Sequence, residues 1–160
     1  MMVNDLKSEK EKGLHVTVSV PVPQIVYVVG IDPGINTGLA LYDKQGKKLT
    51  VVMTVQVHQA FELVKRMNQD GIKIFVRVED ARKRKRYGPN SNAKIQGAGA
   101  IKIQCRQWEM FLQQEGISFD LVAPARIKTK VDAKKFKIIT GWAGRTNNHG
   151  RDAAMLVYGL

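Results

Sequence analysis

Three stretches with strand character follow one another closely near the N-terminal end of the sequence. They span residues 25–32, 37–43 and 48–57 and are rich in apolar and β-branched residues. The turn "DKQGKK" between the second and third contains Gly46, which is typical of a hairpin. Because parallel strands need a long crossover, strands joined by turns this short pair antiparallel. The sequence therefore predicts a three-stranded meander.

The rest of the chain alternates helices with strands. Apolar residues at helical spacing predict a helix over 58–69, and the buried strand "IKIFVRVED" follows it. A long helix is predicted over 93–115, followed by a fifth strand at "ISFDLVAP". Asp132 is suited to the N-cap of a short helix, "AKKFKIIT", that Gly141 closes, and a last helix begins near Asp152. Strands separated by helices join a sheet in parallel. We therefore expect an α/β fold with a mixed five-stranded sheet, three antiparallel strands followed by parallel ones, and helices on both faces.

The first 24 residues differ from the rest in composition. They combine a charged tail with "LHVTVSVPVP", whose alternation of apolar and polar residues is compatible with an extra edge strand. Residues 25–160 are expected to form one domain. The tail lacks the apolar core of a signal peptide, no run is long enough to span a bilayer, and the single Cys105 cannot form an internal disulfide. These features predict a cytoplasmic protein, in a bacterial cell or an infected host cell.

The net charge of +12 is concentrated in one part of the chain. Residues 81–151 hold 16 Lys and Arg against four acids, so this segment accounts for the whole excess. Such a field attracts polyanions, because neutralising phosphates releases their condensed counterions. A solvated basic surface or an anionic membrane is the alternative. The lack of an amphipathic anchor or lipidation signal argues against a membrane and favours nucleic acid.

Acidic residues stand where predicted elements end or begin. Asp32 ends the first strand, and Glu79 ends the strand that follows the first helix. If these strands are parallel neighbours, both carboxylates emerge at the same edge of the sheet. Asp152 lies near the start of the last helix, with His149 three residues earlier, which places both on one helical face if the helix has begun by then. Carboxylates that converge in this way need a cation, and all-oxygen ligation suits Mg²⁺ or Mn²⁺.

Each of these residues also has a purely structural interpretation. Asp32 is suited to capping a tight turn, Asp152 to the first turn of a helix, and His149 to an ordinary surface position. Asp80 is as eligible as Glu79, although the alternation of apolar residues places position 79 on the face opposite the buried one. The combination, in a chain this basic, favours a metal site.

Three motifs in this order carry a family resemblance. "GIDPGINTGLAL", a strand-terminal "VED" and "NNHGRDAAML" resemble the RuvC-type Holliday junction resolvases, bacterial or bacteriophage proteins of the RNase H-like (retroviral integrase-like) superfamily. "PARIKTKVDAKKF" resembles the segment of Pro, Lys and a short helix before the last acid of that family. The resemblance covers residues 25–160 and implies an RNase H-like nuclease domain.

The resemblance also implies the chemistry of the site. Asp32, Glu79 and Asp152 would be the catalytic metal ligands, with two Mg²⁺ ions (or Mn²⁺) per site and no small-molecule cofactor. His149 stands where many members carry a fourth acid, so it would be a ligand or a proton handler. The implied reaction is hydrolysis of phosphodiester bonds in branched DNA, a four-way junction above all, as in recombination and repair. Paired nicks need two sites and therefore a homodimer.

Basic residues near this site are candidates for contacting DNA. Lys128 is the candidate closest to the reacting phosphate, and Tyr87 is suited to stacking on an unpaired base. A solvated charge cluster or a localisation-type patch is the alternative for the basic run. The predicted DNA-binding residues are Arg82, Lys83, Arg84, Lys85, Arg86, Tyr87, Lys130, Lys134 and Lys135.

Two other functions fit parts of the sequence. One is a non-catalytic or broader-specificity RNase H-like nucleic-acid-binding protein. The other is an actin-like phosphate-binding ATPase, which needs two related domains, whereas this chain has room for one. Within the nuclease interpretation, the glycines after Asp32 would keep the turn thin enough for DNA to approach. The long helix would supply part of a dimer interface through Trp108, Met110 and Phe111, or these residues would pack in the core.

Overall fold

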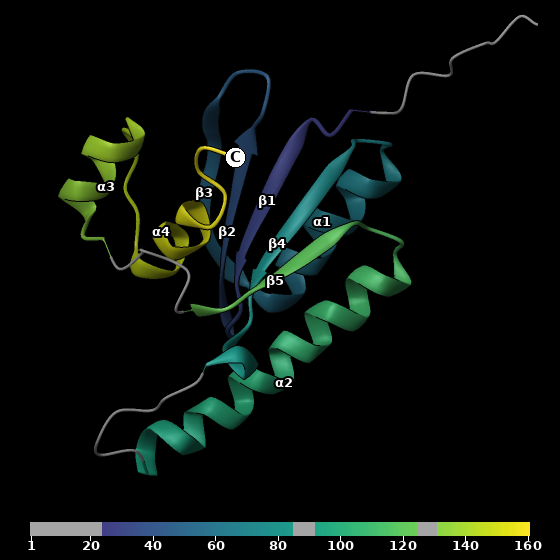
Figure 1. The fold of residues 1–160 in the computed structure, drawn as a ribbon, viewed down its shortest axis with the longest axis vertical. Helices are drawn as coiled ribbons and strands as arrows, with labels where there is room; N and C mark the ends of the chain where they lie inside the picture. Colours follow the sequence, from purple (N-terminus) through teal and green to yellow (C-terminus); the bar gives the residue numbers. More distant parts are fainter. Residues whose placement is uncertain (1–23, 85–91, 125–130) are drawn as a thin grey trace, which may run out of the picture.

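The computed structural model describes residues 24–84, 92–124 and 131–160, with residues 92–96 and 98 described by their backbone alone (Figure 1). The segment "LHVTVSVPVP", predicted as a possible extra edge strand, lies outside the described residues. No helix in the described part of the chain is both long and apolar enough to cross a membrane.

Five strands form a single mixed sheet. They are β1 (Tyr27–Asp32), β2 (Asn36–Asp43), β3 (Lys48–Gln56), β4 (Ile74–Glu79) and β5 (Phe119–Val122). Their order in the sheet is β3-β2-β1-β4-β5. The first three strands pair antiparallel, and β4 is parallel to both β1 and β5. The predicted mixed sheet, with its meander and its parallel strands, is confirmed.

Helices cover both faces of this sheet, as predicted. Figure 1 shows α3 (Ala133–Thr140) and α4 (Asn148–Met155) on one side, and α1 (Val57–Gln69) and α2 (Asn92–Gln114) on the other. A short 3₁₀ turn, η1 (Ala81–Lys83), follows β4 directly. The predicted caps of α3 are also present. The side chain of Asp132 accepts a hydrogen bond from the backbone of Lys135, and Gly141 ends the helix in the left-handed conformation.

Each face of the sheet has its own apolar core, and this determines where the acids lie. In β1, Val28 belongs to the core under α3 and α4, whereas Val29 belongs to the core under α1 and α2. In β4, Phe75 packs against the α4 core and Val76 lies in the other. Because side chains alternate along a strand, Asp32 and Glu79 both belong to the α4 face.

Helix α4 lies unusually close to the sheet because two glycines face it. A Cβ added at Gly30 would lie 2.1 Å from the carbonyl oxygen of Ala153, and one at Gly38 would lie 2.0 Å from that of His149. The helix backbone therefore rests on the strand backbone at both positions. Gly38 thus has a packing role in addition to the one expected from the sequence.

On the opposite face, large side chains separate the helices from the strands. Trp108 of α2 is fully buried, and its ring lies 4.3 Å (centroid to centroid) from Phe61 and 5.7 Å from Phe111. Met110 is 58% exposed. Of the three residues considered for a dimer interface, Trp108 and Phe111 therefore pack in the core, and Met110 is at the surface.

Candidate functional site

The first two acids lie next to each other at one edge of the sheet. In the parallel pair β1–β4, Ile31 is opposite Val78, and Asp32 and Glu79 are the next residue on each strand. Neighbouring strands are about 4.8 Å apart, and both side chains belong to the α4 face. The expectation that the ends of these strands would bring both carboxylates to one edge is confirmed.

His149 joins this pair from the start of α4. Its Nδ1 atom lies 2.8 Å from Oδ2 of Asp32, whose side chain is 15% exposed, while the side chain of His149 is 49% exposed. A carboxylate can only accept in such a bond, so Nδ1 carries the proton and Nε2 is the ring nitrogen on the far side. The structure thus confirms that His149 and Asp32 are close together.

The beginning of α4 is held in place by two further contacts. The side-chain oxygen of Asn147 accepts a hydrogen bond from the backbone of Gly150 at 3.0 Å, which caps the helix. The same oxygen accepts a second bond from the hydroxyl of Thr54 on β3 at 2.5 Å. Together with the close approach at Gly38, these contacts fix where the helix presents His149.

Asp152 lies one turn further along α4. It is half-buried and lines a cavity of about 260 Å³ between α4 and the segment before α3. Val131, Asp132, Asn148 and Arg151 line the same cavity. Asp152 therefore shares this cavity with Asp132, a second carboxylate that the sequence indicated only as a helix cap.

Sequence reasoning missed Arg151, which anchors this end of α4. Its buried guanidinium donates hydrogen bonds to the carbonyl oxygen of Val131 at 3.1 Å and to the carbonyl and hydroxyl of Thr146, both at 3.0 Å. It also donates to the side-chain oxygen of Asn148. The only available signal was an arginine among small residues in a helix, which does not specify its partners.

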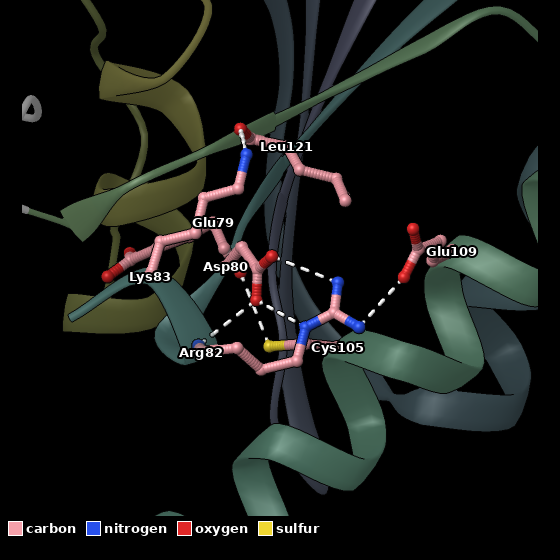
Figure 2. Close-up of polar contacts among 7 residues, drawn as sticks. All are labelled: Glu79, Asp80, Arg82, Lys83, Cys105, Glu109 and Leu121. Carbon is pink, nitrogen blue, oxygen red and sulfur yellow. Dashed lines mark hydrogen bonds and ion pairs between the residues drawn. The ribbon is translucent and has the colours of Figure 1, made fainter.

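Asp80 points away from Glu79 and is fully engaged. It is 1% exposed, and its two oxygens accept hydrogen bonds from the Arg82 guanidinium at 2.8 and 2.9 Å, with a third bond from the Arg82 backbone at 3.0 Å. Figure 2 shows Arg82 between Asp80 and Glu109 of α2, which it contacts at 2.7 Å. This geometry assigns Asp80 a structural role and leaves Glu79 as the acid on the α4 face.

The same contacts change the ionisation of these groups. Burial alone would raise the pKa of Asp80, but the hydrogen bonds from Arg82 and the charges of Arg82 and Lys83 hold it below the ordinary value of 3.8. The hydrogen bond to Asp80 raises the pKa of Arg82. Burial raises the pKa of the neighbouring Cys105 thiol to about 11. Asp80 and Arg82 therefore form a permanently charged pair.

The predicted ligands do not form a closed metal cage. Among the residues that the structure describes, no group of three or more His, Cys, Asp and Glu side chains is arranged to hold a metal ion. Asp32 and Glu79 nevertheless suit Mg²⁺ in their chemistry, because this ion is often held by one or two carboxylates together with substrate phosphate oxygens. The donor set thus fits an ion that binds together with a phosphate.

Among the described residues, those predicted to bind DNA lie on two segments, residues 82–84 directly after β4 and the first turn of α3. Lys83 donates from Nζ to the carbonyl oxygen of Leu121 at 2.5 Å, and Arg84 is exposed beside it. Lys134 and Lys135 are exposed on α3. The guanidinium of Arg82 is bound to two carboxylates. Five predicted site residues lie outside the described part of the chain: Lys85, Arg86, Tyr87, Lys128 and Lys130.

Comparison with known proteins gives a distant structural likeness. No protein-family model matches the chain, and no curated protein matches it. Among solved structures, the chain is similar to one in the cryo-EM structure of the Cas12f1-sgRNA-target DNA complex, with a TM-score of 0.41 and 15% sequence identity. The match covers 89% of this chain, which spans about half (52%) of that chain. The strand order and directions are compatible with an RNase H-like fold.

Proposed function

We propose that this chain is a divalent-metal-dependent endonuclease that cuts branched DNA, with the four-way junction as its main substrate. The observation that carries the proposal is the convergence of Asp32 and Glu79 on one face at adjacent strand ends, with His149 bonded to Asp32. Acids at the ends of parallel strands, beside a helix start, form an arrangement to which a phosphodiester and its metal ions can bind.

The proposed roles come from the family resemblance, and the positions of Asp32, Glu79 and His149 support them. Asp32 and Glu79, with Asp152 from α4, would hold Mg²⁺ or Mn²⁺, two ions per site. Such ions activate a water molecule and neutralise charge on the phosphate. Because Asp32 holds the ring of His149 through Nδ1, the opposite nitrogen Nε2 is the one available to act, and we assign His149 as a ligand or a proton handler through that atom.

The basic half of the chain supports DNA as the substrate. Lys134, Lys135 and Arg84 are exposed among the described residues, and Lys128 is proposed to lie nearest the reacting phosphate. Lysine and arginine side chains hold the backbone of DNA without reading its sequence. Two opposed nicks need two active sites, so the proposed enzyme is a homodimer.

The test is cleavage of a synthetic four-way junction by the full chain with Mg²⁺ or Mn²⁺. We expect paired nicks for the wild type and binding without cleavage for Asp32→Asn. Asp70→Asn, an exposed acid at the end of α1, is the matched control and should cut normally. Normal cleavage by Asp32→Asn would contradict the site assignment. Binding without cleavage by the wild type, with both ions, would favour the non-catalytic alternative.

A further inference from the structure

The strand β4 ends in two consecutive acids whose environments differ completely. Glu79 belongs to the α4 face with Asp32, whereas Asp80 is buried toward α2. Because consecutive residues point to opposite faces, fixing one side chain also constrains the direction of the other. The question is what fixes Asp80.

Asp80 is held by both its side chain and its backbone. The two oxygens bind the Arg82 guanidinium in a fork, a geometry that restricts orientation as well as distance. The backbone nitrogen of Asp80 donates to the carbonyl of Val122 on β5 at 2.8 Å, and its carbonyl accepts from the backbone of Lys83 at 3.0 Å. The peptide before Asp80 is therefore tied to β5, and the peptide after it is tied to η1.

The connection continues into the long helix. Arg82 contacts Glu109 of α2 at 2.7 Å, and the thiol of Cys105, one turn earlier, lies 3.5 Å from the carbonyl oxygen of Glu79 (Figure 2). Two α2 side chains thus reach the end of β4, one through Arg82 and one directly. The helix is linked to the strand end by polar contacts at a place where the rest of the face is apolar.

We propose that Asp80, Arg82 and Glu109 form a positioning network that sets the direction of Glu79 at the candidate nuclease site. The role of Glu79 as a metal ligand in this inference rests on the proposed function, whereas the network itself does not. None of the three needs to touch DNA or metal. The network holds the peptide that follows Glu79. The carboxylate of Glu79 therefore remains on the α4 face, beside Asp32.

A second consequence concerns the basic run that begins at Arg82. Because Arg82 is bound to two carboxylates, the network also fixes the backbone that leads into Lys83 and Arg84. Arg82 then serves as an anchor for the run, and Lys83 and Arg84 are its first exposed members.

The test uses variants that separate positioning from stability. Glu109→Gln removes one charge from a partly exposed site and should fold, whereas Asp80→Asn leaves a buried amide beside an arginine. Arg82→Lys keeps the positive charge but cannot bridge both carboxylates in a fork. The matched control is the exposed pair Glu62–Arg66 on α1, which has the same chemistry at 2.9 Å, changed to Glu62→Gln and Arg66→Lys.

Two readouts are needed. The first is the side-chain carboxyl resonance of Glu79 in NMR spectra of the full chain, which does not depend on activity. The second is junction cleavage, separated into kcat and KM. We expect Glu109→Gln and Arg82→Lys to move the Glu79 resonance and lower kcat about 10-fold, the scale typical of residues that orient metal ligands, with KM little changed. The α1 variants should leave both unchanged.

The outcomes separate this inference from the proposed function. If the wild type cuts no DNA, the proposed function fails, but the Glu79 resonance still tests the network. If Glu109→Gln and Arg82→Lys only lower thermal stability and leave both the resonance and kcat at wild-type values, the network is structural and the inference is wrong. A fall in kcat without movement of the Glu79 resonance would also overturn it.

Discussion

The two faces of the sheet are packed in different ways. On the α1/α2 face, large side chains such as Trp108, Phe61 and Leu112 fill the space between helix and strand. On the α4 face, Gly30 and Gly38 let the helix backbone touch the strands. Side chains can adjust to small changes by altering rotamers, whereas backbone contacts leave no such freedom. The face that carries the candidate site is therefore the more rigidly specified one.

The largest expected effect on stability comes from a change on the α1/α2 face, which is packed by large side chains. Trp108→Ala should lower the free energy of unfolding by about 3–5 kcal/mol, because it leaves a large cavity in a well-packed core. The contact between His149 and Asp32 should persist, since it lies on the other face. Chemical denaturation gives the first quantity, and the His149 ring resonances in NMR spectra report the second. Loss of the His149 contact would show that the two faces are coupled.

A smaller loss of stability, with a larger effect on the site, is expected from Gly38→Ala. The added Cβ would collide with the carbonyl oxygen of His149, so α4 must shift, at a cost of about 1–3 kcal/mol. The His149 resonances should move, and junction cleavage should fall more than in Trp108→Ala. If Gly38→Ala had the stability and the His149 resonances of the wild type, the backbone of α4 would not rest on the strand at this position.

A gain in stability is expected where the added methyl group of an alanine meets no neighbouring atom. Among the described residues, and apart from the neighbouring backbone of its own helix, no atom lies within 4 Å of a Cβ added at Gly97 in α2. Gly97→Ala should therefore stabilise the protein by up to about 1 kcal/mol through helix propensity alone. Thermal or chemical denaturation of Gly97→Ala and Gly38→Ala, each compared with the wild type, measures the two changes in stability. Destabilisation by Gly97→Ala would mean that this part of α2 has a neighbour, such as a second copy of the chain.

The smallest expected signal is the labelling of the Cys105 thiol in the unmodified wild-type protein. Cys105 is fully buried on the α1/α2 face, and its pKa is raised to about 11. At pH 8 the thiol is therefore protonated, since the folded pKa lies above the pH, and a thiol reagent should react only as the protein opens. The labelling rate should rise in Trp108→Ala. Rapid labelling of the native wild type would contradict the packing of this face.

Local signals in the sequence predicted much of this architecture. Short turns and apolar runs were enough for the antiparallel meander, and the alternation of helices and strands was enough for the parallel strands. The order of the strands, which makes β1 and β4 neighbours and brings Asp32 and Glu79 to one edge, came from the structure. Asp132 and Gly141 were correctly predicted as caps, because capping depends on neighbours in the chain. Each of these inferences uses residues that are close in sequence or that follow a simple periodicity.

Other features could not be predicted because they depend on distant partners. The choice between Glu79 and Asp80 rests on Arg82 and on Glu109, which lies about 30 residues later on α2. Gly38 fell at the start of a predicted strand, among the glycines expected to keep the turn after Asp32 thin, and only the position of α4 explains why a side chain is excluded there. Arg82 looked like one of several equivalent basic residues until its two carboxylate partners were seen.

The buried guanidinium of Arg151 has an electrostatic consequence. It lines the same cavity as Asp152 and Asp132, and its hydrogen bonds to carbonyl oxygens of Val131 and Thr146 hold it there. An arginine keeps its proton at any physiological pH, so this positive potential beneath α4 is permanent. Arg151 therefore places a fixed positive charge beside the two acidic side chains that line this cavity, and any anionic group there is attracted to it.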